Sequence, residues 1–201
     1  MIAIIDYDAG NIKSVEKALL FLEQEVILTR DREVILNADK VILPGVGSFG
    51  DAMAKLNEYG LVEVIHEYVK TGKPFLGICL GLQLLFDESE ETPGVAGLGI
   101  LKGKVKRFPE SNEYKIPQIG WNSIKVRPES RLFKGIADDS YVYFVHSYYL
   151  EAVDDNVVAA RTDYIREYHS AVESGNVYAC QFHPEKSSDV GLRILSNFAN
   201  I

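Results

Sequence analysis

Short apolar runs alternate with segments of helical periodicity along the first half of the chain, and this alternation restricts the folds that the chain can adopt. The apolar runs lie at Ile2–Asp6, Val26–Leu28, Lys40–Leu43 and Phe75–Ile78. Each has the length and composition of a strand that is buried on both faces. The segments between them place apolar residues on one side of a helix, and Asn11 can cap the first helix. This alternation predicts a parallel sheet covered by helices on both faces.

The second half of the chain changes to shorter, β-rich segments. The acidic stretch Asp87–Glu91 is interpreted as the solvated end of a helix, Ser174–Asn176 as a hairpin turn, and Asp189–Phe198 as a closing helix. We therefore expect an α/β fold in one domain, residues 1–201. A mixed, largely parallel central sheet would be flanked by helices and joined by an additional small antiparallel sheet. The predicted β-rich segments are Ile100–Phe108, Trp121–Val126, Tyr141–Tyr149, Val157–Thr162, Tyr168–Glu173 and Val177–Phe182.

Composition argues against several classes of function. The net charge of −8 disfavours a nucleic-acid partner or an anionic membrane surface, because both bind clusters of Lys and Arg. No run approaches the ~20 apolar residues of a membrane-spanning helix, and the apolar run at the N-terminus is too short for the core of a signal peptide. Two cysteines in 201 residues do not make a disulfide scaffold. We expect a cytoplasmic protein with reduced thiols and no membrane or nucleic-acid partner.

A glycine-flanked cysteine is the strongest single sign of chemistry. In Gly77–Gly81, Cys79 follows the fourth predicted strand and precedes a helix, which is the arrangement of a nucleophile on a strand-to-helix turn. Glycines on both sides remove side chains that would clash at so sharp a turn. The free N–H groups at the start of the helix favour a thiolate, the reactive form of cysteine. The alternative is a buried cysteine between two packing glycines.

A cysteine nucleophile needs a base, and His183 is the favoured candidate among four histidines. It follows the predicted strand that ends near Phe182, and Glu185 lies two residues further on, where it can orient the imidazole. Alone, this segment could equally be a surface turn. His146 comes at a strand end and could line a site, whereas His66 and His169 are assigned solvated or structural positions.

The segment Pro44–Gly50 also follows a strand, and it contains three glycines. Such a loop can present backbone N–H groups to an anion, either as a phosphate cradle or as an oxyanion hole. The Gly-Lys-Ser/Thr signature of a phosphate loop is absent. The alternative is an ordinary strand–helix turn with no role in binding. Neither a Cys-x-x-Cys pair nor a His-Glu-x-x-His motif is present, so the sequence predicts no metal site and no cofactor.

Taken together, the motifs resemble those of the class I, triad-type glutamine amidotransferases. The resemblance is carried by Pro44–Gly47, Gly77–Gln83 and His183–Glu185. Three further segments are similar to the glutaminase subunits of imidazole glycerol phosphate synthases, which act in histidine biosynthesis: Pro117–Asn122, His146–Tyr149 and Gln181–Ser187. The similarity extends from Ile2 to the end of the chain.

This resemblance implies a flavodoxin-like class I amidotransferase fold and a defined division of labour. Cys79 would attack the side-chain amide of L-glutamine, with His183 as base and Glu185 as its orienting partner. The resulting oxyanion would be held by the backbone N–H groups of Leu80 and Val46. The residues similar to family positions that hold glutamine are Gly47, Gln83, Ser147 and Tyr148.

The resemblance also implies a partner. Family members pass ammonia to a barrel-shaped cyclase subunit, which makes imidazole glycerol phosphate and an aminoimidazole carboxamide ribotide. Asn11, Trp121 and Lys186 match positions that face this partner or the ammonia route. The peptide between Gly45 and Val46 is a hypothetical gate for the weak activity of the subunit without its partner.

Three other readings remain open at this stage. The chain could be the glutaminase of another synthase, of the pyridoxal phosphate or anthranilate type. It could be a stand-alone thiol hydrolase of γ-glutamyl amides. A non-catalytic module on the same fold is the third, although such modules normally lack part of the Cys79, His183 and Glu185 set.

Overall fold

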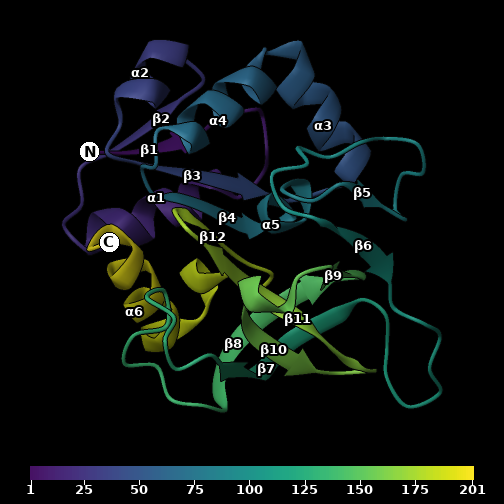
Figure 1. The fold of residues 1–201 in the computed structure, drawn as a ribbon. Coiled ribbons are helices and arrows are strands. Elements are labelled where there is room, and N and C mark those ends of the chain that lie inside the picture. The colour runs from purple at the N-terminus through teal and green to yellow at the C-terminus, as the bar shows by residue number, and fades with distance from the viewer.

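A sheet of twelve strands runs through the molecule, and helices pack against it (Figure 1). The computed structural model describes residues 1–201. The strands are β1 (Ile2–Ile5), β2 (Val26–Thr29), β3 (Lys40–Gly45), β4 (Phe75–Cys79), β5 (Glu88–Ser89), β6 (Gly103–Arg107), β7 (Gln118–Val126), β8 (Ser140–His146), β9 (Tyr148–Ala152), β10 (Val158–Asp163), β11 (Glu167–Ser174) and β12 (Val177–Cys180). The helices are α1 (Ile12–Phe21), α2 (Arg32–Asn37), α3 (Phe49–Glu58), α4 (Leu61–Lys70), α5 (Leu80–Leu84) and α6 (Ser188–Ala199), with short 3-10 helices η1 (Asp155–Val157) and η2 (Pro184–Lys186).

The parallel part of the sheet has the predicted architecture. β2, β1, β3, β4 and β12 lie side by side in this order, and each neighbouring pair is parallel. Successive residues of a strand point to opposite faces. Ile4 and Ile42 therefore join the apolar cluster under α1 and α6, whereas Ile5 and Leu43 join the cluster under α3 and α4. Two cores, one on each face, explain why β1, β3, β4 and β12 are buried along nearly their whole length. The expectation of burial on both faces is wrong for β2, which lies at the edge of the sheet and is only partly buried. None of the helices has the length and apolar character needed to cross a bilayer.

The antiparallel strands continue the same sheet. β11 pairs with β12 through a hairpin at the predicted turn, and β10, β7 and β8 follow in order, with β9, β6 and β5 branching from β11 (Figure 1). The predicted segment Tyr141–Tyr149 is two strands, β8 and β9, which are interrupted at Ser147. This interruption places Ser147 and Tyr148 at the edge of a pocket.

The acidic stretch Asp87–Glu91 was predicted to be the solvated end of a helix, and this prediction is wrong. α5 ends at Leu84, and Glu88–Ser89 forms β5 beside β6. The carboxylates accept backbone N–H groups from other segments: Asp87 from Gly103 at 3.0 Å and Glu91 from Phe49 at 2.7 Å. The run of acidic residues resembled a solvent-exposed segment. The carboxylates of Asp87 and Glu91 instead hold neighbouring backbone segments in place through these hydrogen bonds.

The expectation that Asn11 caps α1 is also wrong. Its backbone is left-handed, with a φ of 65°, and its side chain makes no cap hydrogen bond. The amide donates instead to Glu185, 174 residues away in sequence. α2 was not among the predicted elements, and it begins at a true cap, where the Asp31 side chain accepts from the Val34 N–H.

The register of the parallel strands brings the three predicted motifs to one edge of the sheet. Gly45, at the end of β3, lies opposite Cys79, at the end of β4. Cys180, the last residue of β12, lies opposite Ile78, so the chain that follows β12 delivers His183 to the same edge. The carboxyl ends of strands are where ligands bind in sheets of this type.

Substitution of Gly81 tests whether this edge is as tightly built as the structure indicates. A Cβ on Gly81 would lie 2.0 Å from the carbonyl oxygen of Leu43 in β3. Since backbone must move to relieve this overlap, Gly81→Ala should lower the free energy of unfolding by about 3 kcal/mol, at the upper end for overpacked cores. Urea denaturation measures the change.

The matched control is Gly72→Ala, after α4. Gly72 has a φ of 79° and open space around its Cβ position, so only backbone strain of about 1 kcal/mol is expected there. Equal losses for the two variants would contradict the close approach of α5 to β3.

Candidate active site

Cys79 occupies a strained turn between β4 and α5. Its φ of 55° and ψ of −108° lie outside the regions that L-residues normally adopt. The flanking glycines make the turn possible, because a Cβ on Gly77 would lie 2.6 Å from the Gly81 carbonyl oxygen. The turn lifts the cysteine side chain from the sheet edge into a pocket, as predicted for a nucleophile.

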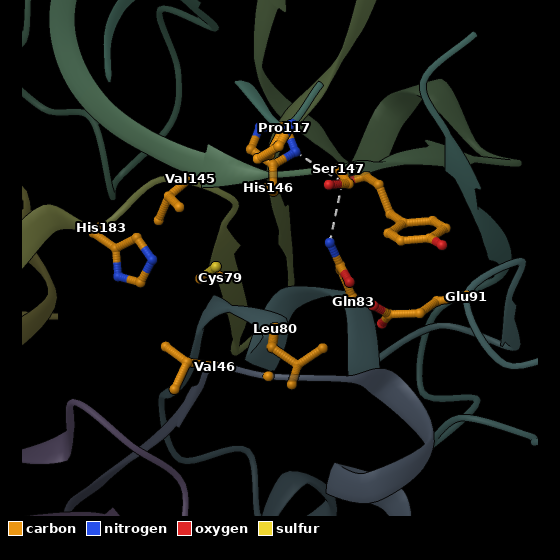
Figure 2. A pocket seen from close by; sticks show the side chains of 12 residues that line it. Val46, Cys79, Leu80, Gln83, Glu91, Pro117, Val145, His146, Ser147 and His183 are labelled. Atoms are coloured by element: carbon orange, nitrogen blue, oxygen red, sulfur yellow. Dashed lines mark hydrogen bonds between the residues drawn. The ribbon is translucent and has the colours of Figure 1, made fainter. Parts of the chain in front are cut away.

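The pocket has a volume of about 350 Å³ and collects most of the predicted site residues (Figure 2). Figure 2 shows Cys79 between His183 on one side and Gln83 with Glu91 on the other. The pocket joins two parts of the sheet, since Cys79 and α5 follow β4 whereas Ser147 and Tyr148 lie where β8 ends and β9 begins. The lining residues are Val46, Gly47, Cys79, Leu80, Gln83, Glu91, Pro117, Val145, His146, Ser147, Tyr148 and His183.

His183 and Glu185 form a buried pair beside the cysteine. The Nδ1 of His183 lies 2.8 Å from the Oε1 of Glu185, and both side chains are shielded from solvent. The Nε2 of His183 has no hydrogen-bond partner, and a ring nitrogen is directed toward Cys79. A base with one nitrogen fixed and the other facing the nucleophile is the arrangement needed for proton transfer, which tightens when substrate binds.

The electrostatics of the pair favour a charged imidazole. Burial alone would lower the pKa of His183, but interactions with the neighbouring Cys79 and Glu185 outweigh burial and raise the pKa to about 10. An imidazolium beside a thiol stabilises the thiolate, so the pair can act as an activated nucleophile.

Gln181 is a site residue that the sequence reasoning did not single out. Its Nε2 donates to the Sγ of Cys79 at 3.8 Å, and its Oε1 accepts from the Nε2 of Gln83 at 3.0 Å. The amide of Gln83 therefore sets the orientation of the Gln181 amide. The only signal in the sequence was that Gln181 lies in the same motif as His183.

Glu91 is a second residue that sequence reasoning missed. It is the one carboxylate that lines the pocket, and its Oε2 accepts the Phe49 N–H. This hydrogen bond fixes the carboxylate at the end of the pocket away from His183 (Figure 2). A negative group there suits the ammonium of an amino acid. No local sequence signal distinguished Glu91 from the neighbouring acidic residues.

The glycine loop after β3 lies at the mouth of the pocket, where Val46 is 37% exposed. The Val46 N–H makes no hydrogen bond within the chain and remains available to an anion. Gly45 is required by space, because a Cβ there would lie 2.6 Å from the Tyr7 hydroxyl and 3.1 Å from the Gly81 nitrogen. A Gly45→Ala variant would therefore disturb the turn as well as any gate.

Four predicted residues do not line the pocket. Glu185 reaches it only through its contact with His183, and the Nδ2 of Asn11 donates to the Oε1 of Glu185 at 2.8 Å. Trp121 on β7 is 51% exposed, and its ring packs edge-on against Tyr143. Lys186 is exposed on η2.

Cys180 has no comparable environment. It is fully buried, its Sγ contacts the Phe182 carbonyl at 3.5 Å, and burial raises its pKa. A neutral buried thiol is unreactive, so the two cysteines differ in chemistry. No group of three or more His, Cys, Asp or Glu side chains is arranged to hold a metal ion.

Comparisons with known proteins identify the family of the chain. The model of the family "Glutamine amidotransferase class-I" matches residues 3–201. The chain is 50% identical to the imidazole glycerol phosphate synthase subunit HisH of Bacillus cereus (strain G9842), over 100% of this chain and 95% of that protein. It is 49% identical to the subunit of the same name from Methanocaldococcus jannaschii, over 100% of both. Among solved structures, a glutamine amidotransferase superposes with a TM-score of 0.76 at 22% identity, covering 98% of each chain.

The titration of His183 tests the electrostatics of the site. The usual histidine pKa is near 6.5, and Glu185 and Cys79 raise that of His183 to about 10. The Glu185→Gln substitution removes one of the two causes, so the pKa should fall toward its usual value. Ring chemical shifts measured by NMR across pH 5–11 report it.

The same shift predicts a dependence of stability on pH. A raised pKa stabilises the folded state fully below about pH 6.5, and this contribution is lost as the pH rises toward about 10. The loss should be smaller in Glu185→Gln than in the unmodified chain. A wild-type His183 that deprotonates at or below pH 6.5 would contradict the account.

Proposed function

The chain belongs to the class I glutamine amidotransferase family, and we propose that it is the glutaminase subunit of an imidazole glycerol phosphate synthase in histidine biosynthesis. The observation that carries the proposal is the buried His183–Glu185 pair beside Cys79 on its strained turn. Full-length relatives at about 50% identity that bear this subunit's name support the choice of pathway. Residues 1–201 would act as one amidotransferase domain.

We derive the reaction from the three residues. His183 holds the proton given up by the Cys79 thiol, and the thiolate sulfur attacks the side-chain carbonyl carbon of glutamine. The C–N bond then breaks, and His183 gives the proton to the departing nitrogen, which leaves as ammonia. Water attacks the remaining thioester, the C–S bond breaks, and glutamate and the free thiol are released. Glu185 holds the imidazole in the orientation that both proton transfers need.

The developing oxyanion needs donors near Cys79. The N–H of Leu80, at the first position of α5, has no acceptor within its own helix, and the N–H of Val46 makes no hydrogen bond within the chain. We assign both to the oxyanion hole. Removal of one such donor typically lowers the rate by about 10²–10³.

The rest of the pocket suits the amino-acid end of glutamine. Glu91 supplies a negative charge for the ammonium, and the hydroxyl of Ser147 makes no hydrogen bond within the chain, so it can contact the ligand. Gln83, Gly47 and Tyr148 line the same region. We assign these residues to substrate binding.

A partner subunit completes the activity. Ammonia would pass to a barrel-shaped cyclase, which would carry out the lyase step that yields imidazole glycerol phosphate and the aminoimidazole carboxamide ribotide. Exposed apolar side chains support such an interface: Val46 at the pocket, and Ile119, Trp121 and Tyr141 on the paired strands β7 and β8. Asn11 and Lys186 are assigned to the partner or ammonia route. A reduced nucleophilic thiol also favours the cytoplasm.

Glutamate release with and without the partner tests the proposal. We expect low release by the chain alone, and an increase of about tenfold or more with the cyclase subunit and a ligand of its site, within the usual range of allosteric coupling. Cys79→Ser should release no glutamate. Strong release that the partner does not change would indicate a stand-alone hydrolase. Stimulation only by a pyridoxal phosphate or anthranilate synthase subunit would indicate another pathway.

Glu91→Gln tests the substrate pocket. Loss of the carboxylate should raise the KM for glutamine about tenfold and change kcat little, because a charge-assisted hydrogen bond to bound substrate is lost. Glu90→Gln is the matched control, since Glu90 bonds the Arg107 N–H outside the pocket. If kcat fell instead while KM stayed constant, Glu91 would act in the chemical step.

A further inference from the structure

We propose that His146 is a positioning residue, which fixes the Tyr148 carbonyl and thereby holds Ser147 and Tyr148 in place for glutamine. The proposal rests on the function inferred above and extends it, because nothing in the triad requires a second histidine. His146 lines the pocket and is buried. The question is what its imidazole does there.

Both ring nitrogens of His146 are occupied. The Nδ1 lies 2.8 Å from the Tyr148 carbonyl oxygen, and the Nε2 lies 3.2 Å from the Tyr168 hydroxyl. A carbonyl oxygen only accepts hydrogen bonds, so the Nδ1 carries a proton and donates it. His146 therefore has no free nitrogen with which to act as a second base, although it lies beside the reacting atoms.

The Tyr148 carbonyl is the point where two parts of the molecule meet. It accepts from His146 at the end of β8 and also from the Nε2 of Gln83 in α5, at 3.1 Å. These two donors approach from opposite sides of the interruption between β8 and β9. One carbonyl thus ties the substrate side of the pocket to α5, the helix that follows Cys79 (Figure 2).

The protonation state of His146 determines which group donates at each hydrogen bond between Gln118 and Tyr148. Burial lowers the pKa of His146 to about 4, so the ring is neutral at pH 7. A neutral ring that donates from Nδ1 must accept at Nε2, and the Tyr168 hydroxyl must therefore donate to it. The hydroxyl has one proton, so its oxygen can only accept from its other neighbour, Gln118.

This requirement determines which atom of the Gln118 amide is the nitrogen and which is the oxygen. With the carbonyl oxygen placed 3.0 Å from the Tyr168 hydroxyl, the buried Nε2 of Gln118 has no partner. Interchange of the amide oxygen and nitrogen lets the NH₂ group donate to Tyr168 and leaves a carbonyl, the less costly group, without a partner. All donors then point from Gln118 through Tyr168 and His146 toward the Tyr148 carbonyl.

Aromatic packing holds the imidazole in this orientation. The rings of Phe108, Phe144 and Tyr168 lie with centroids 5.4, 5.6 and 5.4 Å from that of His146. The ring cannot rotate to aim a nitrogen at Cys79 without disrupting these contacts. Packing and hydrogen bonds therefore both hold the ring fixed, with its Nδ1–H directed at the Tyr148 carbonyl oxygen.

Two substitutions separate the nitrogens. In His146→Asn the amide nitrogen can take the place of Nδ1, whereas in His146→Gln it takes the place of Nε2. With the cyclase subunit present, His146→Gln should raise the KM for glutamine about tenfold, the effect of one lost hydrogen bond, and His146→Asn should stay within about threefold of the unmodified chain. Equal KM values for the two variants would overturn the proposal.

Two further readouts distinguish positioning from general damage. The pH profile of Cys79 alkylation by iodoacetamide should be unchanged in both variants but altered in His183→Ala. A changed profile in His146→Asn would mean that His146 acts on the thiol. Thermal melting identifies a variant that does not fold.

The tautomer of His146 can also be measured directly, by ¹⁵N NMR of the unmodified chain. We expect a proton on Nδ1 at pH 7, and a proton on Nε2 would overturn the proposal whatever the activity. If the unmodified chain with its partner releases no glutamate, the proposed function fails, and the tautomer still decides the role of His146.

Discussion

The close approach of α5 to β3 is the constraint on which the site depends. Gly81 lies against the Leu43 carbonyl with no room for a Cβ, and Gly77 has no room for a Cβ beside the Gly81 carbonyl. Only this approach lets the chain turn at Cys79 through a left-handed backbone conformation. The strain at one residue is maintained because apolar strands on both sides bury the turn, and it directs the thiol into the pocket instead of the core. The other cysteine, Cys180, is part of the regular strand β12 and stays in the core.

A small set of amides then joins the two halves of the sheet around that thiol. Gln83 donates both to the Tyr148 carbonyl and to Gln181, and Gln181 donates to the sulfur. Tyr148, Gln83, Gln181 and Cys79 are thus parts of one hydrogen-bonded unit. Glu185 plays the corresponding part for His183, since its Oε1 accepts from His183 and from Asn11.

The parallel strands, the turn at Cys79 and the convergence of Gly45, Cys79 and His183 could be predicted, because they follow from apolar periodicity and from the rule that strand ends share an edge. Glu91 could not, because a carboxylate that bonds a distant N–H looks the same in sequence as a solvated one. The interruption at Ser147 was hidden inside a continuous β-like segment. Asn11 was read as a local cap because its partner, Glu185, is far away in sequence. Local pattern does not encode contacts of this range.

The central claim is that Cys79 is the nucleophile that attacks the side-chain carbonyl carbon of glutamine. A glutamine analogue with an electrophilic carbon at the amide position would test it most directly, with peptide mass mapping after reaction at pH 7.5. The account predicts one equivalent of label on Cys79, none on Cys180, and much slower labelling in His183→Ala. Label on Cys180, or labelling of Cys79 at the same rate in His183→Ala, would contradict it.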